Sequence, residues 1–164
     1  MGTRKLAIMA LLVAIGVAGS AFVSFPAGIA RAYPVQHAVN VASAIFLGPV
    51  PAIMIAFVTA IIRILTGTGS LLAFPGGMIG AALAGMLFQR TGRVWAAALG
   101  EMMGTGVIAS LLSVPYAAIL MGSSVGAFFF LPPFLISSVS GAIIGAVLAA
   151  RLLNHPIGRR LQHL

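Results

Sequence analysis

Long apolar runs separated by short polar or glycine- and proline-rich stretches form the dominant pattern along this chain. At about 1.5 Å of rise per residue, a helix of about 20 apolar residues crosses about 30 Å of hydrocarbon. The runs predict six membrane-spanning helices, at 6–24, 35–47, 51–66, 71–88, 95–121 and 134–153. We therefore expect an all-α integral membrane protein in which residues 1–164 form a single transmembrane domain.

The second predicted helix, 35–47, is short and has a polar beginning. It spans only about 20 Å, and short segments of this kind often border substrate sites in transporters. The polar and aromatic side chains around its start are Tyr33, Gln36, His37 and Asn40. Pro34 suits a first helical position, which places His37 and Asn40 on one helical face. Because polar groups are costly to bury without a partner, we interpret this stretch as one wall of a ligand pocket rather than ordinary core.

The composition supports a membrane protein and excludes several kinds of site. Hydrophobic residues make up 61% of the chain and charged residues 6%, against about a quarter charged in a soluble domain. There is no cysteine, which excludes disulfides and thiolate chemistry. One carboxylate and no aspartate leave a Ser-His-Asp triad or a metal site without support. The loop at Gly67 and Gly69 lacks the GK[ST] of a phosphate-binding loop, so we expect neither an enzyme nor a bound cofactor.

Basic residues lie at one set of predicted helix ends, and they predict the orientation of the bundle. Nine Lys and Arg residues oppose one acid, for a formal net charge of +8. With six spans, seven of the nine basic residues fall on one face of the membrane, and only Arg31 and Arg63 fall toward the other. The seven are Arg4, Lys5, Arg90, Arg93, Arg151, Arg159 and Arg160. By the positive-inside rule, both termini are then cytoplasmic. The first span lacks an obvious processing site and is expected to be retained, and the loops at 25–33, 66–77 and 122–133 converge on the outer face.

Two further ionisable residues lie within predicted spans. Glu101 follows Trp95 by six residues, roughly 9 Å into the membrane, where an acid is a functional-site hypothesis by default. The alternative is a structural charge pair, or an acid hydrogen-bonded between helices. Arg63 lies near the end of its span and either snorkels to the interface, pairs with Glu101, or faces the pocket. Since His37 and Asn40 have no local charged partner in sequence, the set favours a neutral, ring-containing ligand over an ion.

Aromatic and small residues complete the candidate list. Phe74 and Tyr116 are candidate aromatic walls for a flat ring, with ordinary packing and an interfacial tyrosine as the alternatives. His155 and His163 belong to a basic tail that we expect to be solvated, and Pro115 is expected to kink the fifth span. A stripe of small residues runs along the first span at Ala10, Ala14 and Ala18. Such a stripe permits close helix approach, either inside the bundle or from a separate subunit.

Three strings carry a family resemblance that covers essentially the whole chain. They are AYPVQH at 32–37, GTGSLLAFPG at 67–76 and GEMMGTG at 100–106. Together with the size, the six spans and the alanine stripe, they resemble the ThiW-type substrate-binding S components of energy-coupling factor (ECF) vitamin transporters. The resemblance implies a six-helix S-component bundle in a prokaryotic plasma membrane, crossing it several times. It also implies capture of hydroxyethylthiazole, the thiazole precursor of thiamin.

The same resemblance implies partners and leaves alternatives open. An S component docks on a transmembrane T subunit, and a pair of cytosolic ATPases supplies the energy for transport. This chain has no nucleotide-binding motif of its own. Tyr33, His37, Asn40, Phe74 and Glu101 are the expected ligand contacts. Alternatives are an S component for thiamin or its pyrimidine part, and a channel or structural subunit without a ligand. A membrane enzyme using Glu101 and His37 is disfavoured, because the predicted topology places the two toward opposite faces of the membrane.

Overall fold

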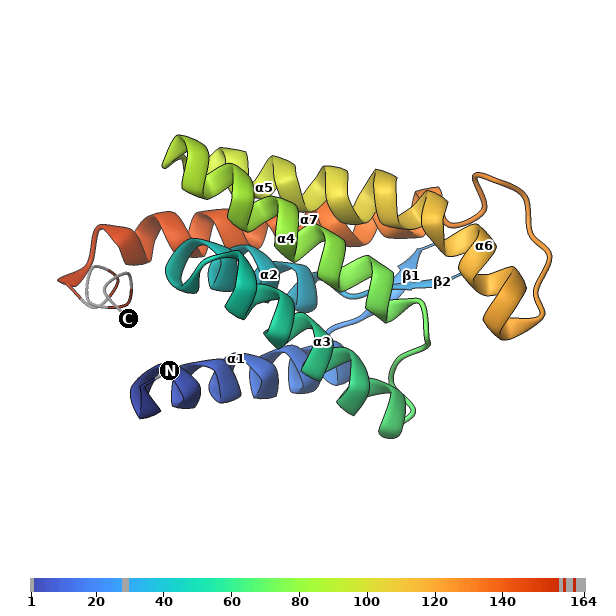
Figure 1. Cartoon of the computed structure of the whole chain (residues 1–164), viewed down its shortest axis with the longest axis horizontal. Helices are drawn as coiled ribbons and strands as arrows, with labels where there is room; N and C mark the ends of the chain where they lie inside the picture. Colours follow the sequence, from blue (N-terminus) through green and yellow to red (C-terminus); the bar gives the residue numbers. More distant parts are fainter. Residues whose placement is uncertain (1, 28–29, 157, 159–160, 162–164) are drawn as a thin grey trace.

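The computed structural model describes residues 2–27, 30–156, 158 and 161, and this part of the chain is almost entirely helical (Figure 1). Six continuous helical rods occupy the six predicted segments. They are α1 (Thr3–Phe22), α2 (Pro34–Leu47), α3 (Pro49–Leu65), α4 (Ala73–Thr91), the run formed by α5 (Val94–Glu101), η1 (Met102–Ala109) and α6 (Ser110–Met121), and α7 (Leu131–Leu153). The predicted helical class and the approximate helix positions are confirmed.

Three of these helices, rather than the predicted six, are long and apolar enough to cross a membrane within the described residues. They are α1, the continuous run Val94–Met121, and α7. α2 and α3 have 14 and 17 residues, short of the roughly 20 that a crossing needs. α4 is long enough, but its glycines and the polar Gln89-Arg90 pair lower its hydropathy. Many large apolar side chains on α1, α6 and α7 are nevertheless exposed, as expected of a surface that faces lipid.

α2 is the central helix and packs against α7, α4, α3 and α1. Glycines on α7 permit a close approach to α2. A Cβ atom at Gly141 would lie 2.5 Å from the Cβ of His37, and one at Gly145 would lie 2.8 Å from the carbonyl oxygen of Ala38. No real side chain tolerates such distances, so small residues fix how deeply α2 is buried between its neighbours.

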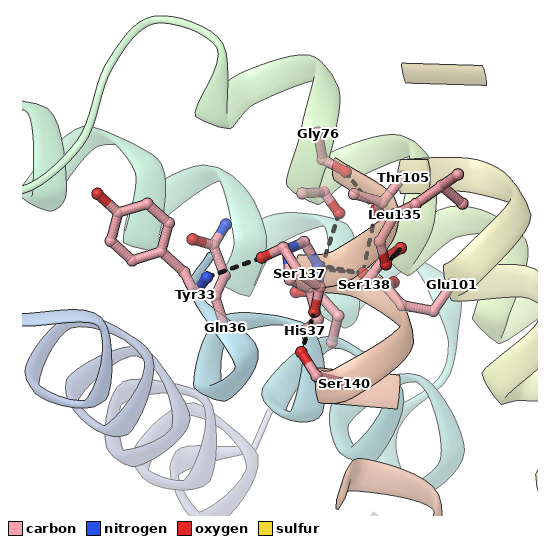
Figure 2. A network of polar contacts seen from close by, with 12 residues as sticks. Tyr33, Gln36, His37, Gly76, Glu101, Thr105, Leu135, Ser137, Ser138 and Ser140 are labelled. Atoms are coloured by element: carbon pink, nitrogen blue, oxygen red, sulfur yellow. Dashed lines mark hydrogen bonds and ion pairs between the residues drawn. The ribbon is translucent and has the colours of Figure 1, made fainter. Parts of the chain in front are cut away.

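A short β-ribbon replaces the irregular first loop. Strands β1 (Phe25–Ala27) and β2 (Ala30–Ala32) pair antiparallel, with Phe25 opposite Ala32 and Ala27 opposite Ala30. The sequence correctly excluded a helix here but predicted no strand, because two three-residue strands are too short to show an alternating pattern. The backbone N–H of Tyr33 donates to Ser137 Oγ at 2.8 Å, which ties the end of the ribbon to α7 (Figure 2).

The two ends of the bundle differ in what they carry. Figure 1 shows the start of α1, the end of α4 and the end of α7 at one end, on the left. The β-ribbon and the loops after α3 and α6 lie at the other end. The predicted convergence of the three loops is therefore confirmed, whereas the side of the membrane that they face stays a prediction. Of the basic residues assigned to the first end, Arg159 and Arg160 lie outside the described residues, as does His163.

The longest helix changes its winding partway along. Residues Met102–Ala109 form a π-helix, η1, immediately after Glu101. Pro115 lies inside α6, and Figure 1 shows α6 running at an angle to the preceding part of the rod. π-Helical turns often occur at functional sites because they re-aim side chains relative to a regular helix. Trp95 is exposed at the start of α5, with the guanidinium of Arg93 5.8 Å from its ring centre.

Candidate functional site

A cavity of about 480 Å³ opens at the loop end of the bundle. It lies between the end of α1, the β-ribbon, the start of α2, the end of α3 and the loop that follows it, the first turns of α4, and the start of α7. Four predicted site residues line it, namely Tyr33, Gln36, His37 and Arg63. The predicted pocket is thus present, and the polar start of α2 forms part of its wall.

Asn40 and Glu101 lie behind this wall and form a buried hydrogen-bonded cluster with His37. The Nδ1 atom of His37 lies 2.6 Å from Glu101 Oε1. The amide of Asn40 donates to the same oxygen at 3.1 Å and to the carbonyl of Gly77 at 3.1 Å. Figure 2 shows the carboxylate of Glu101 together with His37 and Thr105. Because a carboxylate oxygen accepts, the cluster holds the proton of the His37 ring on Nδ1 and turns Nε2 away from Glu101.

Thr105 joins the cluster from the π-helix. Its Oγ1 lies 3.0 Å from Glu101 Oε1 and 2.7 Å from the carbonyl oxygen of Gly76, so its single proton serves one of two acceptors. Glu101 and Thr105 are four residues apart, and η1 begins between them. The π-helix therefore begins where the Glu101 carboxylate and the Thr105 hydroxyl both face the interior of the bundle.

The second oxygen of Glu101 has a different environment. Oε2 is buried and has no hydrogen-bond partner among the described residues. It lies beside Gly80, where an added Cβ would stand 2.5 Å away. A Cβ at Gly104 would likewise lie 2.7 Å from the Cα of Gly80, so α4 and η1 touch backbone to backbone at this level. Small residues here make room for the only carboxylate side chain in the chain.

This cluster adds a partner that local reasoning could not find, and it corrects one prediction. His37 and Asn40 have no charged partner nearby in sequence, but Glu101, 64 and 61 residues away along the chain, lies within hydrogen-bonding distance of both. His37 and Glu101 also do not lie toward opposite faces of the membrane. α2 has only 14 residues and begins inside the bundle, so its first turns reach the same depth as the end of α5. The argument used against a membrane enzyme was therefore wrong in its geometry.

Arg63 does not pair with Glu101 and does not snorkel; it is buried beside the cavity. Its side chain is 2% exposed. One terminal nitrogen donates to Gln36 Oε1, and the other donates to the carbonyl oxygen of Thr68 at 2.8 Å. The guanidinium carbon lies 4.0 Å from the centre of the Tyr33 ring, a cation–π arrangement. Of the three alternatives for Arg63, the position beside the cavity agrees with the pocket-facing one.

The aromatic wall differs from the predicted one. Phe74 packs against Phe57, with 5.5 Å between the ring centres, and Tyr116 lies on α6. Neither Phe74 nor Tyr116 lines the cavity. Phe130 and Phe134, from the start of α7, line it instead. Their position near the end of the fifth loop is the only feature of the sequence that could have pointed to them. Phenylalanines are common in so hydrophobic a chain and do not by themselves mark a site. Thr105 and Ser137 also line the cavity and were not predicted.

A second, apolar hollow of about 630 Å³ lies between α1 and α3. The stripe of Ala10, Ala14 and Ala18 lines it from α1, and all three alanines are exposed. Met54 and Val58 line the groove from α3 and are exposed as well. The stripe is therefore not fully used for packing within this chain.

Comparison with known proteins gives one clear result. No curated protein matches this sequence. The family model described as thiamine-precursor transporter protein (ThiW) matches residues 6–155, which is nearly the whole chain and includes every residue of the cavity. A helical membrane protein with a cavity at one end of its bundle agrees with this family description. The chain belongs to the ThiW family of thiamine-precursor transporter proteins.

Proposed function

We propose that this chain is the substrate-capture S component of an ECF-type importer, and that its substrate is hydroxyethylthiazole. The observation that carries the proposal is the cavity at the loop end, which is lined by polar side chains in an otherwise apolar bundle. Its volume lies within the usual range for small-molecule sites, about 300 to 1,000 Å³. A cavity at one end, bounded by the buried cluster around Glu101, supports a binding subunit rather than an open channel.

The cavity wall offers the contacts that a hydroxylated heteroaromatic ring needs. Phe130 and Phe134 supply apolar faces for the ring. Nε2 of His37 has no hydrogen bond to another described residue, and with the proton on Nδ1 it is an acceptor for a ligand hydroxyl. Glu101 and Asn40 act through His37 by holding its ring. Thiamin is a less suitable ligand, because its cationic ring would lie close to Arg63 and Arg31.

Basic residues at the opposite end support an orientation for this bundle. Arg4, Lys5, Arg90, Arg93 and Arg151 belong to the ends of α1, α4, α5 and α7 that lie away from the cavity. We assign that end to the cytoplasm of a prokaryotic cell and the cavity to the outside. All six helical rods then cross or partly cross the membrane, with the short α2 and α3 enclosed by longer neighbours.

The apolar groove between α1 and α3 supports the docking of a partner. A transmembrane T subunit that inserts a helix there would approach closely along Ala10, Ala14 and Ala18. ATP hydrolysis would be left to the pair of cytosolic ATPases that an ECF importer contains. This chain contributes substrate binding and is not itself an enzyme.

The test is binding of thiamin precursors to the purified protein. We expect isothermal titration to show saturable binding of hydroxyethylthiazole, with weaker binding of thiamin and of the hydroxymethylpyrimidine precursor. His37→Ala should weaken binding by roughly 5- to 150-fold, the effect of losing one buried polar contact. Arg93→Gln, at the opposite end of the bundle, is the matched control and should bind normally. Absence of saturable binding to any precursor would contradict the proposal.

A further inference from the structure

The charges around the cavity point to an acidic ligand. We propose that the natural ligand carries an anionic group, a phosphate or carboxylate attached to its heteroaromatic ring, and that Arg63 is its counter-ion. This inference rests on the proposed function, because it keeps the same cavity and the thiazole ring, and it changes one part of that function by adding an acidic group to the neutral hydroxyethylthiazole proposed above. It departs from the neutral ligand that the sequence favours.

Arg63 has hydrogen-bonding capacity that the protein leaves unused. A guanidinium has five N–H donors, and in the described part of the chain Arg63 donates to Gln36 and to the Thr68 carbonyl, with the Tyr33 side chain beside it. Its Nε is buried without a partner. Both acceptors are neutral, as is the Tyr33 ring on which the guanidinium lies, so none of them neutralises the charge. A buried charge without a counter-ion is strongly unfavourable.

No side chain of this protein is available to neutralise Arg63. The sequence contains a single acidic side chain, Glu101. Its Oε1 is occupied by His37, Asn40 and Thr105, and although its Oε2 has no hydrogen-bond partner, neither oxygen forms a hydrogen bond or ion pair with Arg63 in the described part of the chain. Arg31 also lines the cavity, and its hydrogen bonds to described residues go to Ser24, another neutral residue. The cavity therefore contains two guanidinium groups and no acid, and the missing negative charge must come from outside the chain.

The loop after α3 fixes Arg63 in this position. The carbonyl of Thr68 accepts from the guanidinium, and the Oγ1 atoms of Thr66 and Thr68 lie 3.3 Å from the carbonyl oxygen of Arg63. Gly69 packs so closely that a Cβ there would lie 3.0 Å from the Cβ of Arg63. A guanidinium held in one orientation suits the paired oxygens of a phosphate or carboxylate, which it binds through two parallel hydrogen bonds. Arg63 and His37 come from different helices, so they can bind two different groups of one ligand.

The test compares matched pairs of ligands that differ only in the acidic group. Isothermal titration is carried out with hydroxyethylthiazole and its monophosphate ester, with hydroxymethylpyrimidine and its monophosphate ester, and with inorganic phosphate. We expect the thiazole ester to bind about 10- to 100-fold more tightly than the alcohol, as charge-assisted hydrogen bonds imply. Arg63→Gln should reduce the ester-to-alcohol affinity ratio, measured on the same variant, to less than about threefold, and Arg63→Lys should retain part of the difference. Arg93→Gln should preserve it fully.

The outcomes separate this inference from the proposed function. If the thiazole alcohol binds as tightly as its ester, or if Arg63→Gln weakens both equally, the anionic ligand is refuted while the thiazole assignment stands. If only the pyrimidine pair binds and its ester binds more tightly, the thiazole assignment fails and the anionic class is upheld. Equal binding of inorganic phosphate and the thiazole ester would refute a ring-bearing ligand, and no binding at all would refute both proposals.

Discussion

Glu101 and Arg63 are both buried ionisable residues in an apolar helical bundle, yet the protein surrounds them in opposite ways. Glu101 Oε1 lies within hydrogen-bonding distance of three polar side chains from two helical rods. Arg63 meets only neutral acceptors and an aromatic ring, and it lies beside a cavity. The Glu101 carboxylate is therefore stabilised by hydrogen bonds within the protein, whereas the Arg63 guanidinium has no anionic partner in the chain and is positioned for a ligand to supply one.

The largest expected effect concerns stability without ligand. Glu101→Ala removes the shared acceptor of His37, Asn40 and Thr105, and should lower the free energy of unfolding by about 3–5 kcal/mol, as breaking a buried charged cluster does. Arg63→Ala removes an unneutralised charge along with its two hydrogen bonds, so its loss should be much smaller. Thermal unfolding in detergent without ligand measures both. Equal destabilisation by the two variants would show that Arg63 stabilises the fold as much as Glu101 does.

The next effect tests the space around the carboxylate. Gly80→Ala would place a methyl group 2.5 Å from Glu101 Oε2 and should destabilise the protein by about 1–3 kcal/mol through overpacking. Gly126→Ala is the matched control, because a Cβ there meets nothing within 4 Å. The same thermal assay applies. A neutral Gly80→Ala variant would mean that α4 and η1 move apart freely and that the cluster is not tightly confined.

A third prediction divides the cluster between binding and support. His37→Ala should act mainly on ligand affinity, because His37 lines the cavity. Asn40→Ala should act mainly on stability, by about 1–3 kcal/mol, because Asn40 donates to Glu101 and to the Gly77 carbonyl and does not line the cavity. Titration and thermal unfolding on both variants separate the two effects. The reverse assignment would place Asn40 in direct contact with the ligand.

The smallest effect on ligand binding in the cavity is expected from substitutions in the apolar groove. Ala10→Leu or Ala14→Leu fills an exposed groove far from Glu101 and Arg63, so ligand affinity should stay within a few-fold. Association with the T subunit should be lost, because a bulky side chain prevents close helix approach. Co-purification with the other subunits measures this. Normal assembly of both variants would show that the groove is not the docking surface.

Local sequence patterns were sufficient for the helices but not for the contacts between them. Apolar runs placed all six rods, and a cluster of polar residues correctly indicated one wall of the cavity at Tyr33, Gln36 and His37. The His37–Glu101 contact joins residues 64 apart, and no local pattern reveals it. The prediction of opposite depths failed because the assumed topology placed the start of α2 toward the outer face, whereas the first turns of α2 lie beside the end of α5. Phe74 and Tyr116 were the named aromatic candidates, but Phe130 and Phe134 line the cavity, because the sequence alone does not show which way an aromatic side chain faces.

Helix α1 belongs to both hollows of the molecule. Its last residues, including Ser20 and Ala21, line the polar cavity, while seven residues between Leu6 and Ala18 line the apolar groove. A fifth of its residues are buried, and its tightest packing is where Gly16 meets Thr59 and Gly19 meets Val35. An occupant of either hollow that shifts α1 changes the shape of the other. By linkage, the factor by which a docked partner alters ligand affinity must equal the factor by which ligand alters partner affinity.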